Sequence, residues 1–399
     1  MYNWLHNFSF SYLCPLSNFM AASSILERLE RYPQFCDGAL LLLREKAAGS
    51  IQPLLMADWS ELHNDVLEHL TSFFSLPDCH RFGSVCKIWH LVAREKHHPP
   101  QQLPWLVLGE DDAAHKRKFF SLEENRTYLI DIPELQGQQL CGSSYGWLFT
   151  MDVELNFRLL NPFTRRCYDL PPPGGEGLMV AKAILDRDPS HSPEFKVLII
   201  MHGERNRLAF WKLGDPTWTL IPDASYFFDD IIFFKEEFYA VAAFNSNNDI
   251  YLINTGPNPN VKRVGPHVKI HGTFAYLVDY MGELLLVQRY REVFKDMVFI
   301  TKRIIIIKVD LEGKKYSEYK PSEGYSVFMG ANSCMTVDPR KYAGCKKNAL
   351  YLTDMPLQIF GKHGSKDIWI YDMVEGSFSR YYSARQYIPA SPIWLNPNP

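Results

Sequence analysis

A hairpin pattern that recurs after residue 104 constrains the fold of this chain more than any single motif. Each copy has a short apolar strand, a turn that is polar or carries Gly or Pro, and a second strand that often contains an aromatic residue. The copies recur about every 50 residues on average, which is within the range of propeller repeats. Six copies are found, at residues 119–132, 157–170, 208–221, 250–264, 304–319 and 368–382.

Further strand-like runs lie between these copies, at 146–151, 195–201, 230–244, 274–287 and 325–329. Two hairpins per period make a four-stranded blade, and six periods make a closed ring that leaves no long unpaired strand edge. We therefore predict an all-β, six-bladed β-propeller over residues 105–396. We also predict that 392–395 complete the first blade beside 105–107. A β-sandwich with additional strands is the alternative.

The stretch 58–96 has helical spacing instead. Apolar residues three and four positions apart predict a first and a third helix, and Pro77 suits the first turn of a helix between them. The spaced residues are Val66, Leu70 and Phe73, then Val85, Trp89 and Val92. An all-α unit this short buries too little apolar surface to fold firmly alone, so we expect another surface to cover the excess.

The same stretch resembles the F-box family. The matching residues are the run 62–67, Leu76-Pro77-Asp78 and the run Val-Cys-Lys-Ile-Trp at 85–89, with His63 where the family usually has proline. The resemblance implies binding to a Skp-type adaptor and, through it, to a cullin-RING ubiquitin ligase. The adaptor-binding residues that it implies are Leu62, Val66, Leu67, Leu70, Pro77, Val85 and Trp89.

The region that follows is similar to the KIB-type, kelch-like β-propeller of plant F-box proteins. The similarity rests on residues 142–148, on 160–164 leading to 170–172, and on 367–372. It implies a substrate-recognition subunit, not an enzyme, whose propeller loops bind a protein substrate that the sequence does not identify. The alternative is a propeller scaffold or ligand-binding protein whose F-box does not engage an adaptor.

Three parts are expected along the chain. Residues 1–56 are predicted to be a variable or disordered extension, in which Met20 and Met56 are candidate start residues. Residues 57–100 form the F-box and 105–396 the propeller, with a short proline-containing connector between them.

Composition argues against several classes of partner. The formal net charge of −3 gives no reason to expect nucleic acid, and no run approaches the roughly 20 apolar residues of a membrane-spanning helix. The 8 cysteines are scattered without the close pairs of redox or zinc motifs, which suits reduced thiols in the cytoplasm or nucleus.

Patterns that suggest catalysis have simpler interpretations. Gly142-x-Ser144-x-Gly146 matches the nucleophile elbow of hydrolases, but the residues that follow are strand-like, so we interpret it as a glycine turn between blade strands. The adjacent acids Asp229 and Asp230 are expected at a solvated turn. We predict no catalytic residue.

One group of residues has side chains that could bind zinc: Cys79, His80, Cys86 and His90. Zinc ligands usually come in tight pairs on loops or hairpins, whereas Cys86 falls in the helical Val-Cys-Lys stretch. We therefore expect no metal and no cofactor.

Overall fold

The structure is a computed structural model. It describes residues 63–71, 82–83, 86–95, 102–111, 114–174, 179–203, 206–222, 227–244, 246–293, 299–321, 324–342, 344–353, 368–381 and 392–397. The chain divides into two compact units, Met1–Gln102 and Leu103–Pro399. The predicted extension 1–56 lies outside the described residues, as do Leu62, Pro77 and Val85.

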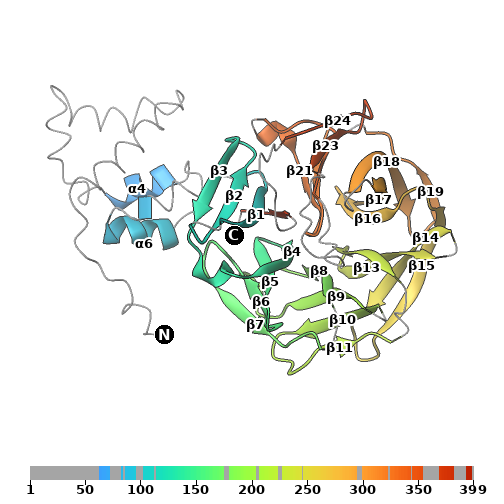
Figure 1. The fold of residues 1–399 in the computed structure, drawn as a ribbon, viewed down its shortest axis with the longest axis horizontal. Helices are drawn as coiled ribbons and strands as arrows, with labels where there is room; N and C mark the ends of the chain where they lie inside the picture. The colour runs from blue at the N-terminus through green and yellow to red at the C-terminus, as the bar shows by residue number, and fades with distance from the viewer. Residues whose placement is uncertain are drawn as a thin grey trace. The chain divides into compact units, whose positions relative to one another are not determined.

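The second unit is a ring of six sheets (Figure 1). Four of them are built from four consecutive antiparallel strands, as the repeat predicts. These are β4 (Gln139–Ser144), β5 (Trp147–Met151), β6 (Phe157–Leu160) and β7 (Cys167–Leu170) in the second blade; β8 (Met179–Leu185), β9 (Lys196–His202), β10 (Arg207–Lys212) and β11 (Thr219–Leu220) in the third; β12 (Phe228–Phe234), β13 (Glu237–Phe244), β14 (Asn247–Asn254) and β15 (Asn260–Lys269) in the fourth; and β16 (Phe274–Tyr280), β17 (Glu283–Val293), β18 (Phe299–Asp310) and β19 (Lys315–Glu318) in the fifth.

The first blade joins strands from both ends of this unit. It contains β1 (Trp105–Asp111), β2 (Lys116–Ser121), β3 (Arg126–Ile130) and β25 (Ile393–Leu395), in the order β25-β1-β2-β3. Trp105 pairs with Leu395 and Val107 with Ile393, antiparallel. The prediction that 392–395 complete the first blade is confirmed, and a six-bladed propeller is the fold.

The sixth blade departs from the repeat because it has five strands. They are β20 (Ser326–Met329), β21 (Met335–Val337), β22 (Ala349–Leu352), β23 (Trp369–Asp372) and β24 (Phe378–Ser379). Strand β20 pairs in parallel with β22 and antiparallel with β21. The described part of this unit also contains short 3-10 helices at Pro133–Leu135 and Pro339–Lys341.

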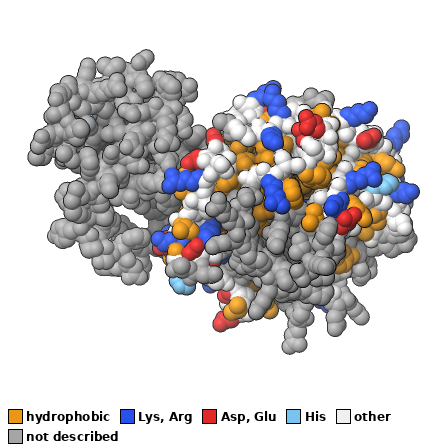
Figure 2. All heavy atoms as spheres, turned by 45° about the horizontal axis from the view of Figure 1, so that its top comes forward, with side chains coloured by type: hydrophobic (Ala, Val, Ile, Leu, Met, Phe, Trp, Pro, Cys, Tyr) orange, Lys and Arg blue, Asp and Glu red, His pale blue; other side chains and the backbone are white. Residues whose placement is uncertain are grey.

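All six hairpins of the repeat are antiparallel pairs in the structure. Each forms the outer half of its blade, from β2–β3 in the first to β23–β24 in the sixth. The face of the molecule shown in Figure 2 mixes apolar, basic and acidic side chains.

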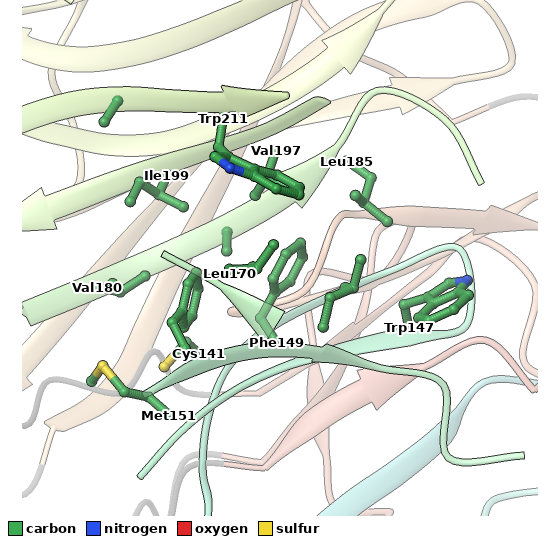
Figure 3. Packing of buried hydrophobic residues seen from close by; sticks show 14 of the residues in the cluster. Cys141, Trp147, Phe149, Met151, Leu170, Val180, Leu185, Val197, Ile199 and Trp211 are labelled. Atoms are coloured by element: carbon green, nitrogen blue, oxygen red, sulfur yellow. The ribbon is translucent and has the colours of Figure 1, made fainter. Parts of the chain in front are cut away.

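The core of the propeller lies between neighbouring blades. Between the second and third blades, Trp147 and Phe149 of β5 pack in one cluster with Val197 and Ile199 of β9 and Trp211 of β10 (Figure 3). Strand β5 is buried along its whole length. Strands covered on both faces are apolar throughout, which explains why many runs in this sequence do not alternate.

Candidate functional site

Two helices of the first unit carry the F-box motif residues. They are α4 (Asn64–Thr71) and α6 (Lys87–Glu95). The second of the three predicted helices falls largely outside the described residues, although Phe82 and Gly83 are helical. No helix in the described part of the chain has the length and hydropathy needed to cross a membrane.

Helix α4 begins directly after His63, the residue that replaces the usual proline. The Leu67 N–H donates to the His63 carbonyl at 3.2 Å, which is the first hydrogen bond of the helix. The Asp65 N–H donates to His63 Nδ1 at 3.4 Å, so the imidazole supplies an acceptor for a backbone donor in the first turn. Asn64 and Asp65 occupy this turn as predicted.

Leu67 and Trp89 lie inside the helical unit. Leu67, Phe82 and Trp89 are buried, and the rings of Phe82 and Trp89 stack with their centroids 4.4 Å apart. Val92 is buried one turn beyond Trp89. The two predicted residues therefore hold the helices together and present no surface of their own in this structure.

A neighbouring side of α6 exposes two large apolar residues that were not among the predicted contacts. Ile88 is 42% and Leu91 43% exposed. They are three positions apart and so share one side of the helix. The sequence already indicated this, because Ile88 and Leu91 each stand one position before the spaced pair Trp89 and Val92 and therefore cannot lie on the same side of the helix. The side chains of Val66 and Leu70, both in α4, are outside the described residues.

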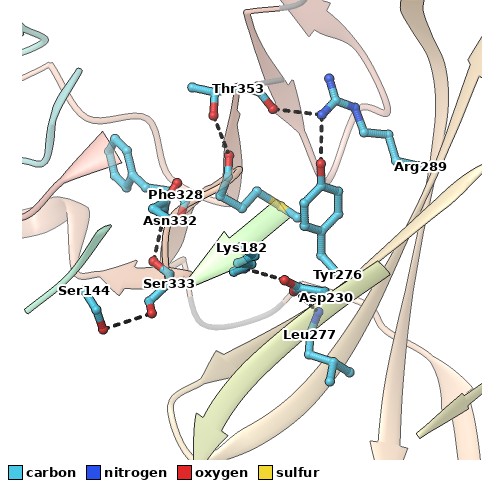
Figure 4. Close-up of polar contacts among 11 residues, drawn as sticks. Ser144, Lys182, Asp230, Tyr276, Leu277, Arg289, Phe328, Asn332, Ser333 and Thr353 are labelled. Atoms are coloured by element: carbon cyan, nitrogen blue, oxygen red, sulfur yellow. Dashed lines mark hydrogen bonds and ion pairs between the residues drawn. The ribbon is translucent and has the colours of Figure 1, made fainter. Parts of the chain in front are cut away.

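Polar side chains from several blades come together at the centre of the propeller (Figure 4). Lys182 of β8 forms a fully buried ion pair with Asp230 of β12, and Asp230 also accepts from the Leu277 N–H of β16 at 2.8 Å. One carboxylate thus joins the third, fourth and fifth blades. Although burial alone would lower it, attraction to Asp230 holds the pKa of Lys182 above its usual value.

The expectation that Asp229 and Asp230 sit at a solvated turn is wrong. Both are buried within β12. Asp229 accepts from the Ala275 N–H at 3.2 Å, and burial raises its pKa to about 7. Their binding partners lie more than 40 residues away in the sequence, on β8 and β16, so no local pattern pointed to them.

Arg289 of β17 plays the same joining role between the fifth and sixth blades. Its guanidinium is buried and donates to Thr301 Oγ1 at 2.6 Å, to the Tyr276 hydroxyl at 3.3 Å and to the Thr353 carbonyl at 2.9 Å. The remaining side of the sixth blade is joined to the first through Trp394, whose indole N–H donates to the Tyr351 carbonyl at 3.2 Å.

A segment of the sixth blade reaches across the centre of the ring. The Ser333 N–H donates to the Ser143 carbonyl of β4 at 2.8 Å, two blades away, and the Ser333 and Ser144 hydroxyls are 3.1 Å apart. Asn332 beside it is fully buried. The protein's own backbone and side chains therefore occupy this part of the centre.

The Gly142-x-Ser144-x-Gly146 motif lies at the end of β4. Tyr145 and Gly146, with φ of 49° and 79°, form the turn into β5. The Ser144 hydroxyl accepts from the Leu185 N–H of β8 at 3.3 Å and so joins the second and third blades. The prediction of a glycine turn between blade strands is confirmed.

Residues 119–372, more than half of the chain, match the KIB1-4 beta-propeller family. The chain belongs to this family. The predicted similarity to plant F-box proteins with a KIB-type propeller is confirmed, because its Arabidopsis thaliana relatives carry F-box names.

Three such relatives show the range of similarity. F-box protein At1g10110 is 36% identical over 29% of this chain and 28% of its own length. F-box/kelch-repeat protein At1g57790 is 22% identical over 85% of this chain and 94% of its own, and F-box protein At3g56470 is 24% identical over 84% and 87%. The chain therefore spans less than a third of the first of these relatives and most of the other two. Among solved structures, TolB from Acinetobacter baumannii is similar with a TM-score of 0.42 and 11% identity, over 80% of this chain and 72% of its own.

Proposed function

We propose that this protein is a substrate-recognition subunit of a Skp-cullin-F-box ubiquitin ligase. The observation that carries the proposal is the order of its parts: F-box motif residues on α4 and α6 precede a closed KIB-type propeller. In this role residues 57–100 bind a Skp-type adaptor, and the loops of the propeller bind a substrate protein.

The proposed adaptor surface combines predicted and newly found residues. Leu62, Val66, Leu70, Pro77 and Val85 remain predicted contacts. Ile88 and Leu91 join them because they are large, apolar and exposed on α6. Leu67 and Trp89 act by packing the helices that carry this surface.

No chemical step is assigned to this subunit. It contributes proximity, because holding a substrate lysine near a charged thioester makes the transfer effectively intramolecular. The transfer itself belongs to the RING partner and its conjugating enzyme. A location in the cytoplasm or nucleus accords with the cysteines of the described part of the chain, which are all free.

The second candidate is a propeller scaffold whose F-box does not engage an adaptor. His63 in place of proline is the feature that favours it. However, α4 begins directly after His63 with a normal first hydrogen bond, which supports an intact F-box helix.

The test is co-purification of the full chain with a co-expressed Skp-type adaptor. Replacing Ile88 and Leu91 with Glu puts two charges into the proposed apolar contact and removes about 3 kcal/mol or more of burial, so adaptor recovery is expected to fall by at least a hundredfold. The matched control is Val153→Glu with Val374→Glu, which changes exposed valines of the propeller. Failure of the wild-type chain to bind the adaptor, or full binding by Ile88→Glu/Leu91→Glu, would contradict the proposal.

A further inference from the structure

A basic groove runs along the outside of the propeller between the fourth and fifth blades. Its walls are β15 and β19, the outermost strands of these blades, together with the turn before β19. The lining residues with charged or aromatic side chains are Arg263, His267, Lys314, Lys315 and Tyr316. In Figure 2 basic side chains and a histidine gather at the right-hand edge, where Figure 1 places these strands.

Three cations of this groove have no ion-pair partner among the residues that the structure describes. Arg263, Lys314 and Lys315 are exposed, and none of them makes an ion pair or side-chain hydrogen bond within the part of the chain that the structure describes. No acidic residue lines the groove. By contrast, Lys308 on the neighbouring strand β18 pairs with Glu283. The groove therefore offers three cations that are not held in ion pairs, with the nearest acids in sequence and register being Asp310 opposite Lys315 and Glu312 in the turn before Lys314.

The shape of the groove comes from irregular backbone. Pairing between β14 and β15 shifts between Asn248 and Ile250, so the three residues 265–267 face Asp249 alone and bulge outward. Gly265 has a φ of 71°, and a Cβ there would lie 3.0 Å from the Leu311 side chain, so this glycine lets the two blades approach closely. Bulges often redirect side chains next to functional sites.

Two side chains are positioned by these irregularities. The bulge brings His267 Nδ1 to 2.7 Å from a carboxylate oxygen of buried Asp249, which fixes the orientation of the imidazole. Lys314 has a φ of 50°, a conformation uncommon for a residue other than glycine, and this turn directs it to the groove.

Lysines on outer strands also have a protective use, because they discourage sheets from pairing edge to edge. Lys315 on β19 fits that explanation. It does not account for the bulge, for a histidine held by a buried carboxylate, or for the half-exposed Tyr316 in the lining of the groove. These features describe a surface that can hold an anionic chain in one position.

We propose that this groove binds an extended acidic segment of the substrate protein. Carboxylate or phosphate oxygens of that segment contact Arg263, Lys314 and Lys315, and Tyr316 packs against one of its side chains. Arginine and lysine bind both kinds of oxygen, with arginine able to do so through two parallel hydrogen bonds. Nucleic acid is disfavoured because it needs a wide basic surface, whereas the whole chain carries a net charge of −3. The proposal rests on the function proposed above and names the class of substrate.

The experiment uses the full chain and fluorescein-labelled peptides of twelve residues in fluorescence anisotropy. One peptide alternates Glu with Ser, a second has phosphoserine at the serines, a third has Gln in place of Glu, and a single-stranded oligonucleotide of equal charge completes the set. Arg263→Glu/Lys315→Glu is compared with Arg166→Glu/Lys341→Glu, which makes the same change of charge at exposed residues elsewhere on the propeller.

We expect the acidic or the phosphorylated peptide to bind and the Gln peptide not to bind. The affinity for the anionic peptide should fall at least about tenfold in Arg263→Glu/Lys315→Glu and stay unchanged in the control variant. The wild-type affinity should also fall as the salt concentration rises. The ratio between the two anionic peptides separates carboxylate from phosphate recognition. Equal binding by both variants, absence of binding to either anionic peptide, or tighter binding of the oligonucleotide would overturn the proposal.

Adaptor co-purification is measured on the same proteins. Loss of adaptor binding with intact peptide binding would contradict the proposed ubiquitin-ligase role but not the proposed peptide-binding groove. The reverse result would remove only the groove. The two proposals therefore fail separately.

Discussion

The two units of this protein reach stability in different ways. In the propeller, apolar strands are buried between neighbouring blades. Hydrogen bonds accepted by Asp230 and donated by Arg289 and Trp394 join blades at the centre. In the helical unit a few side chains, such as Leu67 and Trp89, form the described interior while Ile88 and Leu91 stay exposed. The propeller thus has an extensive interior between its blades, whereas the described interior of the helical unit is small.

The largest effect on adaptor binding is expected from substitutions in the small interior of the helical unit. Leu67→Ala with Trp89→Ala removes two buried side chains, each worth about 2–5 kcal/mol, from a unit too small to tolerate the loss. Adaptor binding should disappear while the main thermal transition of the propeller stays in place, as measured by pull-down and calorimetry. Adaptor binding at the wild-type level would contradict this division.

The next effect tests the centre of the propeller. Asp230→Ala leaves the buried ammonium of Lys182 without its partner and should lower the free energy of unfolding by about 3–5 kcal/mol in urea titrations. The control is Lys308→Ala, which breaks a pair whose side chains are 44% and 43% exposed and should change stability by about 1 kcal/mol or less. Similar values for the two variants would show that the central pair does not hold the blades together.

A moderate effect is expected from pH. Because the pKa of Asp229 is raised from 3.8 to about 7 in the folded state, the folded protein binds more protons than the unfolded chain between these values. This contribution to stability is fully present below about pH 4, is lost progressively by up to about 1.4 kcal/mol per pH unit as the pH rises, and is gone once the pH has passed about 7.

Asp229→Asn should remove that dependence, so its melting temperature should fall less than that of the wild type between pH 6 and pH 8. Glu236→Gln, at an exposed turn, controls for loss of a carboxylate. Parallel curves for wild type and Asp229→Asn would rule out the proposed titration.

The smallest effect concerns the start of α4. His63→Pro restores the usual F-box residue, and the carbonyl of residue 63 can still accept from the Leu67 N–H. Because the histidine side chain makes only exposed contacts, with the Asp65 N–H at 3.4 Å and the Asp65 carboxylate at 3.3 Å, we expect adaptor affinity to change by less than about threefold, or about 0.6 kcal/mol. A gain of tenfold or more would indicate that His63 impairs the F-box.

The sequence predicted what is local in this fold. The six outer hairpins follow from turns and strand patterns within about 15 residues, and the apolar run at 392–395 was enough to predict the closing strand. The parallel pair β20–β22 and the crossing at Ser333 were not predicted, because they depend on contacts between blades. Asp229 and Asp230 were misplaced for the same reason, since two adjacent carboxylates are expected in solvent unless their partners, Lys182 and the backbone of β16, are known.

The pairing of β25 with β1 also has a consequence during synthesis. Strand β1 leaves the ribosome before the five blades that follow it, and its inner edge has no neighbour until residues 393–395 have been made. Contacts between distant parts of a chain form slowly, so a nascent chain passes through a long interval with an open sheet edge. A nonsense mutation or proteolytic cut just before Ile393 would keep every other strand and leave β1 without its β25 partner, so the ring could not close. We expect such a truncated chain to be recognised as misfolded.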